Sequence, residues 1–271
     1  MQDSRSPSIT IVTPCLNGAA TLPAALASVR DQAYDGTVEH VVVDGGSTDG
    51  TLAILESAPG LRYISEPDRG LSDAVNKGFR MAGGEIVGWL NADDVYLPGA
   101  LAKVGQAMAR RPDALWATGR CRIEDGHGRE IRSLVSAYKN LFVRRYRYEL
   151  LLTQNFVSCP ATFVRRAGFD RVGLLDERFR YSMDYDLWLR LGRLGDPVVI
   201  DEALAAFRMA EGSLSMTGFE RQFAEHARNA REHGDGHAPA VLVNRLLSRG
   251  IVATYRGIRL GRSFTRRPTT S

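Results

Sequence analysis

The first third of the chain alternates between short apolar runs and segments with helical spacing. The apolar runs predict four strands, at residues 8–13, 38–43, 63–64 and 85–90. Helices are expected between them, one opening at Thr21 and the others over 51–57 and 72–82, where Ser72 and Asp73 suit the helix start. This β-α-β order is typical of the α/β class, an open and mostly parallel sheet flanked by helices.

The second half has a less regular pattern. It predicts a helix over 97–110, a strand over 115–123, a turn over 125–129 and a later helix through Leu187, Leu191 and Leu194. Two further short strands are expected at 198–200 and 204–208. With no repeat or linker in view, we expect one domain over 1–234, with halves at 8–98 and 99–210, and a basic tail over 235–271.

Composition narrows the class of protein. A hydrophobic content of 44%, a charged content of 24% and a net charge of +4 are ordinary for a globular chain. The three cysteines are widely spaced, which argues against a disulfide framework or a zinc site. No signal peptide and no transmembrane run is expected, so a cytoplasmic protein is predicted, at most touching the inner face of a membrane.

Three polar clusters each follow a predicted strand: "TPCLNG", "DGGSTDGT" and "NADD". Ligands of open α/β sheets bind outside the carboxyl ends of the strands, so the shared position indicates one site. Asp44 ends a buried strand before two glycines, where its carboxylate can receive the N–H of a nucleobase. Ser47 and Asp49 are better suited to turn or capping roles.

The stretch "VGWLNADD" places Asn91, Asp93 and Asp94 at a strand end. Mg²⁺ and Mn²⁺ prefer oxygen ligands, often one or two carboxylates plus substrate phosphates. An acidic turn is common by itself, but this one follows four β/α units and accompanies Asp44. A cation held here would neutralise a leaving diphosphate.

Two acids, Asp184 and Asp186, lie where a loop becomes a helix in "SMDYDLW". The helix macrodipole favours acids in a first turn, so capping accounts for one of them. The aromatic neighbours indicate a drier setting, in which one carboxylate serves as a general base. Spacing alone leaves these two interpretations open.

Taken together, "VVVDGGSTDGT", "SEPDRGLSDAVNKG", "AGGEIVGWLNADD", "PATFVRR" and "YSMDYDLWLRLG" resemble a family 2 glycosyltransferase of the GT-A fold. The resemblance covers about residues 8–208 and implies that the domain over 1–234 is catalytic, with the nucleotide-sugar half at 8–98 and the acceptor half at 99–210. It implies inverting transfer of a sugar from a nucleotide diphosphate donor, with UDP favoured, usually with Mg²⁺ or Mn²⁺. Such an enzyme would assemble a cell-surface glycan or glycolipid.

By position, the resemblance gives roles to individual residues. Thr13 and Pro14 would line the nucleobase pocket and Asp44 would bind the base, while Asp73 would lie near the nucleoside or diphosphate. The remaining expected roles are a ribose contact for Asn91, metal binding for Asp93 and the catalytic base for Asp184.

Two positions depart from the family pattern. The first acid of its D-x-D motif is Asn91, and the acid usually preceding the base is Met183. Asp94 is a second candidate ligand, Asp186 a second candidate base, and Lys77 or Arg208 would add positive charge at the diphosphate. The rival functions are a nucleotidyltransferase, which would want Lys or Arg in "TPCLNGAATLP", and a non-catalytic nucleotide-sugar binding module.

The remaining sequence is basic. Segments 143–152 and 164–166 mix arginines with apolar residues, which fits either an acceptor border or a solvated helix. After Asp235 the chain has seven arginines and no acid. Arg245 and Arg249, with Arg256 and Arg259, share a helical face opposite Val243, Leu247, Ile251 and Ile258. This pattern fits an interfacial helix drawn to anionic lipid, as a lipid-linked saccharide acceptor would need, or a helix packed on the domain. No nucleic acid partner is expected, because no reader motif accompanies the charge.

Overall fold

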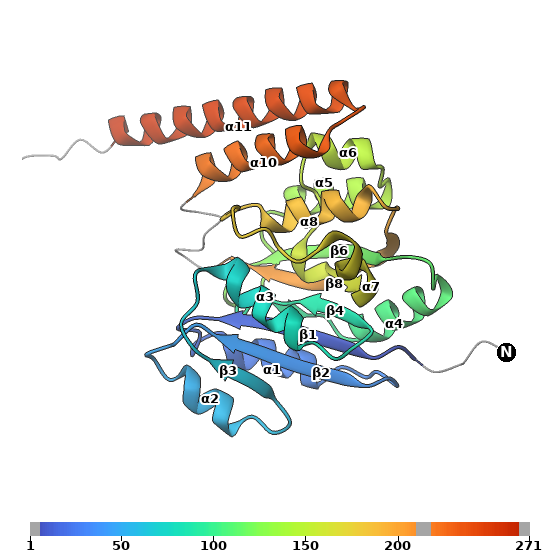
Figure 1. The fold of residues 1–271 in the computed structure, drawn as a ribbon. Helices are drawn as coiled ribbons and strands as arrows, with labels where there is room; N and C mark the ends of the chain where they lie inside the picture. Colours follow the sequence, from blue (N-terminus) through green and yellow to red (C-terminus); the bar gives the residue numbers. More distant parts are fainter. Residues whose placement is uncertain (1–5, 210–217, 266–271) are drawn as a thin grey trace, which may run out of the picture.

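The computed structural model describes residues 6–209 and 218–265, with side chains described as far as residue 254. An eight-stranded sheet runs through the molecule in the order β3-β2-β1-β4-β7-β6-β8-β5 (Figure 1). The strands are β1 Ile9–Cys15, β2 Val38–Asp44, β3 Arg62–Ser65, β4 Ile86–Trp89, β5 Val95–Tyr96, β6 Trp116–Glu124, β7 Thr162–Arg165 and β8 Val198–Arg208.

Helices cover both faces of this sheet. They are α1 Leu22–Arg30, α2 Thr51–Ser57, α3 Leu71–Met81, α4 Ala100–Arg110, α5 Ser133–Arg144, α6 Tyr148–Thr153, α7 Arg166–Val172, α8 Met183–Gly192, α10 Phe219–His233 and α11 Ala238–Thr265, with a 3₁₀ turn η1 at Cys159–Ala161. The α/β class is therefore confirmed.

The pairing explains where polar residues gather. Strands β3, β2, β1 and β4 are all parallel, and Cys15 at the end of β1 pairs with Asp44 at the end of β2. Side chains alternate between the two faces of a strand: Ile11 packs in one hydrophobic cluster and Val12 in the other. Because the four strands run parallel, their carboxyl ends meet at one edge of the sheet.

The second half turns the sheet into a mixed one. Strand β7 is antiparallel to both β4 and β6, whereas β6 and β8 are parallel. The two short strands expected at 198–200 and 204–208 are one strand, β8, because a register shift opposite Arg120 lets pairing with β6 continue through both runs. The helix expected over 97–110 begins at Ala100, after Gly99 adopts a positive φ of 75°.

The expectation that Ser72 caps α3 is wrong. Ser72 makes no capping hydrogen bond to α3, and its hydroxyl donates to the carbonyl of Phe179 at 3.3 Å.

Residues 164–166 lie at the amino end of β4. Arg165 pairs there with Ile86, and Arg166 reaches the carbonyl of Gly83. This segment is therefore at the opposite end of β4 from Asp93.

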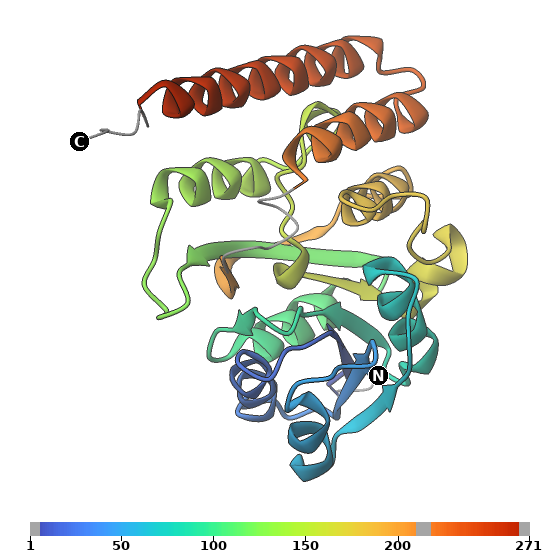
Figure 2. The same ribbon diagram turned by 90° about the vertical axis from the view of Figure 1, so that its left-hand side faces the viewer.

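The aromatic segment 143–152 is mostly a packing element. Val143, Leu151 and Leu152 are buried, and Tyr146 stacks edge-on against Trp116 with ring centroids 5.6 Å apart. Figures 1 and 2 show α10 and α11 lying alongside each other at the end of the molecule away from α2. None of the described helices combines the length and hydropathy needed to cross a bilayer.

Candidate active site

Asp44 organises the loop that follows β2. Its Oδ2 accepts hydrogen bonds from the backbone N–H groups of Gly46 and Ser47 and from the hydroxyl of Ser65, at 3.1, 3.0 and 2.6 Å, and Ser47 Oγ donates to Oδ1. Burial alone would raise the pKa of Asp44, but these hydrogen bonds outweigh it and hold the pKa below its ordinary value. Asp44 is thus a fixed, fully buried carboxylate that organises this loop.

The loops after β1 and β2 are hydrogen-bonded to each other. The backbone N–H groups of Asn17, Gly18 and Ala19 donate to Ser47 Oγ, Thr51 Oγ1 and Asp49 Oδ2 at 2.7, 3.0 and 3.0 Å. Asp49 and Ser47 therefore have the turn roles that the sequence indicated. The result is a rigid rim next to Asp44.

Thr13 and Pro14 are both buried at the end of β1. The hydroxyl of Thr13 is 2.9 Å from Nε2 of His40, which ties β1 to β2 and occupies that hydroxyl. Pro14 pairs with Val43, one residue before Asp44. The structure thus brings Thr13, Pro14 and Asp44 together at one sheet edge.

Asp73 gathers two cations at the start of α3. Its Oδ2 accepts the backbone N–H of Arg69, its Oδ1 accepts the Arg69 guanidinium, and Lys77 Nζ lies 3.7 Å from Oδ2. The hydrogen bond from the backbone of Arg69 is the main reason that the pKa of Asp73 is lowered. Lys77 also pairs with Glu66 at 2.8 Å, so it belongs to this loop rather than to the carboxylates after β4.

The residues after β4 form a short chain of hydrogen bonds. The indole Nε1 of Trp89 donates to Asn91 Oδ1 at 2.9 Å, and Asn91 Nδ2 donates to Asp94 Oδ2 at 3.0 Å. Asn91 is therefore an amide that uses both ends, which an aspartate at this position would not do. Its divergence from the family motif has this structural reason.

Asp93 differs from its neighbour Asp94. Asp94 is fully buried and accepts the backbone N–H of Arg208 at 3.0 Å, whereas Asp93 is half-buried and its side chain makes no hydrogen bond to another described residue. Burial raises the pKa of Asp93, and burial together with the charge of Asp93 raises that of Asp94 well above its ordinary value. A carboxylate pair of this kind is repulsive until a cation arrives.

Arg208 supplies the nearest described positive charge to this pair. It ends β8, its backbone binds Asp94, and its charge acts to lower the pKa of Asp94. Its Nε lies 3.8 Å from Glu124 and has no hydrogen-bond partner among the described residues. Of the two cations named from sequence, Arg208 is the one placed beside Asp94.

Asp184 lies in the first turn of α8 and is half-buried. Burial is the main reason that its pKa is raised, and a hydrogen bond from Asn155 Nδ2 to its Oδ2, at 3.2 Å, and the charge of Lys139 both oppose that rise. Within the described part of the chain it forms no salt bridge. A half-buried carboxylate with an elevated pKa is suited to take a proton.

Asp186 has a different environment two residues later. It is buried, its Oδ2 accepts Arg190 Nη2 at 2.7 Å, and its Oδ1 lies 2.8 Å from His233 Nε2. Both oxygens thus connect α8 to its own next turn and to α10. This engagement leaves Asp184 as the available carboxylate of the two.

The η1 turn contacts the end of β4. Its Cys159 thiol lies 3.7 Å from the carbonyl of Trp89. Burial raises the pKa of that thiol, and the charges of Asp184 and Asp94 raise it further. Cys159 is thus a residue on which a carboxylate after β4 and the base candidate of α8 both act electrostatically.

Three residues of this region escaped sequence reasoning. Asn155, in the segment after α6, donates a hydrogen bond to Asp184, and the charge of Lys139 in α5 lowers the pKa of Asp184. Glu225 of α10 accepts the backbone N–H groups of Tyr181 and Ser182, at 2.8 and 3.0 Å, just before α8 begins. The partners are far apart in the chain, so no local motif signals them.

The family model described as "Glycosyl transferase family 2" matches residues 10–173. The chain belongs to glycosyltransferase family 2. It is accordingly an enzyme that transfers sugars, and the resemblance seen in its motifs is confirmed.

Relatives and solved structures agree with this assignment. An uncharacterized glycosyltransferase of Mycobacterium tuberculosis is 30% identical over 74% of this chain and 75% of its own. A PGL/p-HBAD biosynthesis glycosyltransferase of Mycobacterium bovis is 30% identical over 80% of this chain and 83% of its own length.

Two solved structures share the fold at low identity. S. aureus TarS 1–349 in complex with UDP-GlcNAc has a TM-score of 0.63 at 19% identity, covering 82% of this glycosyltransferase and 65% of TarS 1–349. The mannosyltransferase PcManGT from Pyrobaculum calidifontis, in complex with GDP-Man and Mn²⁺, has a TM-score of 0.64 at 18% identity, covering 95% and 81%. At this identity the likeness shows the GT-A fold alone.

Proposed function

We propose that this glycosyltransferase transfers a sugar from a nucleotide diphosphate donor to an acceptor hydroxyl with inversion at the anomeric carbon. UDP is the favoured nucleotide, a choice supported by the UDP-GlcNAc complex of TarS, although PcManGT holds GDP-Man. The acceptor is a saccharide or a lipid-linked saccharide in glycan or glycolipid assembly, in keeping with the name of the M. bovis relative. A lipid-linked acceptor would place the enzyme at the cytoplasmic face of a membrane.

The donor would lie along the carboxyl edge of β1, β2 and β4. Asp44 accepts the N–H of the base, between Thr13 and Pro14 on one side and the rim of residues 45–50 on the other. Asn91 lies where a ribose contact is expected. Asp73 acts through the cations it gathers, because its own oxygens already bind Arg69.

The residues after β4 fit a divalent cation. Asp93 offers a half-buried carboxylate without a hydrogen bond, Asp94 lies next to it, and hard cations are commonly held by one or two carboxylates plus substrate phosphates. No cluster of three or more His, Cys, Asp or Glu suited to a metal occurs in the described residues, so the donor phosphates would complete the site. When bound, Mg²⁺ or Mn²⁺ would stabilise the negative charge of the leaving diphosphate.

Asp184 is the proposed general base. It takes the proton from the acceptor hydroxyl, whose oxygen then forms the new bond at the anomeric carbon while the bond to the diphosphate breaks on the opposite side. The nucleotide diphosphate leaves with the bonding electron pair, and Arg208 lies where it can balance part of that charge. Asn155 keeps Asp184 oriented for this step.

The observation that carries this proposal is that Asp93 and Asp184, at the metal and base positions of the family pattern, are half-buried carboxylates without a salt bridge among the described residues. Cys159 of η1 contacts the end of β4, and the charges of Asp94 and Asp184 both act on its thiol. A nucleotidyltransferase would need a basic triphosphate loop after β1, and "TPCLNGAATLP" contains neither Lys nor Arg. A binding module would have no use for a carboxylate with a raised pKa at the position of Asp184.

Two measurements test the proposal. Asp184→Asn should lower sugar transfer, or donor hydrolysis, by roughly 10²–10⁴-fold while leaving nucleotide affinity by calorimetry nearly unchanged. Asp170→Asn, at an exposed acid of α7, is the matched control and should behave as wild type. Near-wild-type turnover by Asp184→Asn would refute the base. Turnover that survives EDTA would refute the metal, and no turnover with any donor and Mn²⁺ would favour a binding module.

A further inference from the structure

Helix α11 packs on the domain through its polar side. Asn244 and Ser248 are the buried residues of its first turns, at 1% and 7% exposure. Asn244 Nδ2 donates to the carbonyl of Leu152 at 3.0 Å, and Ser248 Oγ donates to Asn244 Oδ1 at 3.4 Å. The inner face of this helix is therefore tied by Asn244 to α6 and, through the Tyr185 hydroxyl at 3.4 Å, to α8.

The outer face of the same helix is apolar. Leu242 and Leu246 are 56% and 59% exposed, and Val243 and Leu247 are exposed beside them. At 100° per residue Leu242 and Leu246 lie opposite Asn244 and Ser248, and Val243 and Leu247 lie on one flank of that outward face. A helix of a soluble domain normally buries its apolar stripe, so this arrangement indicates a partner for the outward face.

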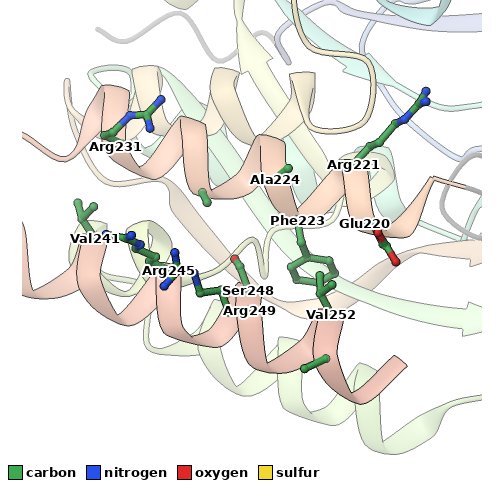
Figure 3. Close-up of a pocket in the computed structure, with 12 residues that line it drawn as sticks. Glu220, Arg221, Phe223, Ala224, Arg231, Val241, Arg245, Ser248, Arg249 and Val252 are labelled. Carbon is green, nitrogen blue, oxygen red and sulfur yellow. The ribbon is translucent and has the colours of Figure 1, made fainter. Parts of the chain in front are cut away.

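An arginine-lined groove lies next to this face. It has a volume of ≈ 1200 Å³ between α10 and α11, with Phe223 and Val252 at its floor (Figure 3). Arg245 and Arg249 lie along it on α11, and Arg221 and Arg231 flank it on α10. These four arginines make no salt bridge or side-chain hydrogen bond with the part of the chain that the structure describes; one acid, Glu220, also lines the groove.

We propose that α10 and α11 bind the surface of an anionic phospholipid bilayer. The side chains of Leu242, Val243, Leu246 and Leu247, here called the α11 apolar ridge, enter the interfacial region of the lipid. Arg245 and Arg249, at the flank of that ridge, pair with lipid phosphates at the mouth of the groove. Amphipathic helices bind membranes through this combination of buried apolar area and attraction to anionic headgroups.

Charge decides between a bilayer and a second copy of the chain. From residue 236 to 271 the sequence has no acid, so two α11 helices meeting face to face would bring arginines together without carboxylates of their own. An anionic bilayer offers phosphates to every arginine at once. This surface is separate from Asp93 and Asp184, so lipid binding is measured without the transfer reaction and the two proposals fail independently.

Flotation of the full chain with vesicles tests the proposal. Wild type should float with vesicles of phosphatidylcholine containing about one-third phosphatidylglycerol, and much less with phosphatidylcholine alone. Arg245→Gln/Arg249→Gln should lower the partition coefficient on anionic vesicles roughly 30-fold. Leu242→Ser/Leu246→Ser should lower it on both kinds of vesicle, because the buried apolar area is lost.

Matched controls change the same residue types elsewhere. Arg110→Gln/Arg171→Gln and Leu52→Ser/Leu194→Ser alter exposed side chains on other elements and should float like wild type. Unchanged melting temperatures would show that the variants are folded. Equal flotation of wild type and both α11 variants would overturn the proposal. A wild-type dimer in light scattering that Leu242→Ser/Leu246→Ser dissociates, without flotation, would overturn it in favour of self-association.

Discussion

The side-chain amide of Asn155 donates a hydrogen bond to Asp184, with Nδ2 and Oδ2 3.2 Å apart. Burial raises the pKa of Asp184, and this hydrogen bond favours the charged carboxylate and so lowers the pKa. The backbone N–H of Tyr185 and the charge of Lys139 lower the pKa as well, so Asn155 is one of several groups that set the pH above which Asp184 can take a proton.

Asn155→Ala should therefore raise the pKa of the base. A hydrogen bond to a charged group contributes about 1.5–3 kcal/mol, equivalent to roughly one to two pH units. We expect the acid limb of kcat/KM against pH to move up by about one unit, with the plateau at high pH retained.

Gln154→Ala is the control for Asn155→Ala. Gln154 is the adjacent residue and accepts the hydroxyl of Tyr138 at 2.7 Å, so its loss perturbs the same segment without touching Asp184. Its acid limb should coincide with that of wild type. An unmoved acid limb in Asn155→Ala would show that Asp184 is not the titrating base.

Asp93→Asn should stabilise the enzyme while it has no metal bound. The pKa values of Asp93 and Asp94 are raised, first by burial, and the charge of Asp93 raises that of Asp94 further. Removing one charge relieves the pair, and a gain of about 1 kcal/mol would raise the melting temperature by about 2–4 °C at neutral pH. The same variant should lose the thermal shift produced by Mn²⁺ with a nucleotide diphosphate.

The pH dependence of that stability has a definite sign. Carboxyl groups with a raised folded pKa bind protons more tightly when folded. The stability they contribute is present below the ordinary carboxyl range and is lost as the pH rises through the raised values. The melting temperature of the metal-free wild type should fall over this interval more steeply than that of Asp93→Asn, and parallel curves would refute the repulsion. Asp170→Asn should follow wild type.

Much of the fold followed from local pattern. The helix expected over 51–57 is α2, Thr51–Ser57, and the four expected strands of the first half are β1 to β4 within two residues at each end. Parallel strands buried on both faces read as continuous apolar runs, so this half is legible from sequence. The antiparallel insertion of β7 between β4 and β6 could not be predicted from sequence, because it depends on contacts between residues about 75 positions apart, such as Val87 and Val164.

Part of the site could also be predicted from sequence. Asp44 and Asp93 were indicated because each lies at the end of a predicted strand, and a parallel sheet brings such strand ends together. The roles of Asn155 and Glu225 depend on packing between distant segments, which no spacing reveals. The inverted orientation of α11 was equally hidden, since a helical wheel gives its faces but not which one meets the domain.

Asn91→Asp restores the acid of the family motif and should cost stability. Asp at this position still accepts the Trp89 indole but cannot donate to Asp94 Oδ2, and it adds a third carboxylate. We expect a loss of about 1–3 kcal/mol in the free energy of unfolding at neutral pH, recovered in part on acidification or on adding Mn²⁺.

Asn91→Ala separates charge from hydrogen bonding in that experiment. It removes both hydrogen bonds without adding a carboxylate, so its melting temperature should not recover on acidification beyond that of wild type. If Asn91→Asp is as stable as wild type without metal, the amide bridge between Trp89 and Asp94 has no energetic role.

Asp186→Asn should give the opposite pattern to Asp184→Asn. Asp186 holds Arg190 and His233 in a buried position, so its neutralisation leaves the Arg190 guanidinium, itself mostly buried, without a counter-charge. Breaking such a pair typically costs about 3–5 kcal/mol, measured as a lower denaturant midpoint. Turnover per folded molecule should stay within a few-fold of wild type, and the acid limb of its pH profile should not move.

His233→Gln removes the α10 partner alone and should lower stability by less, again with turnover retained. A large loss of kcat in folded Asp186→Asn, with Asp184→Asn still active, would transfer the role of base to Asp186.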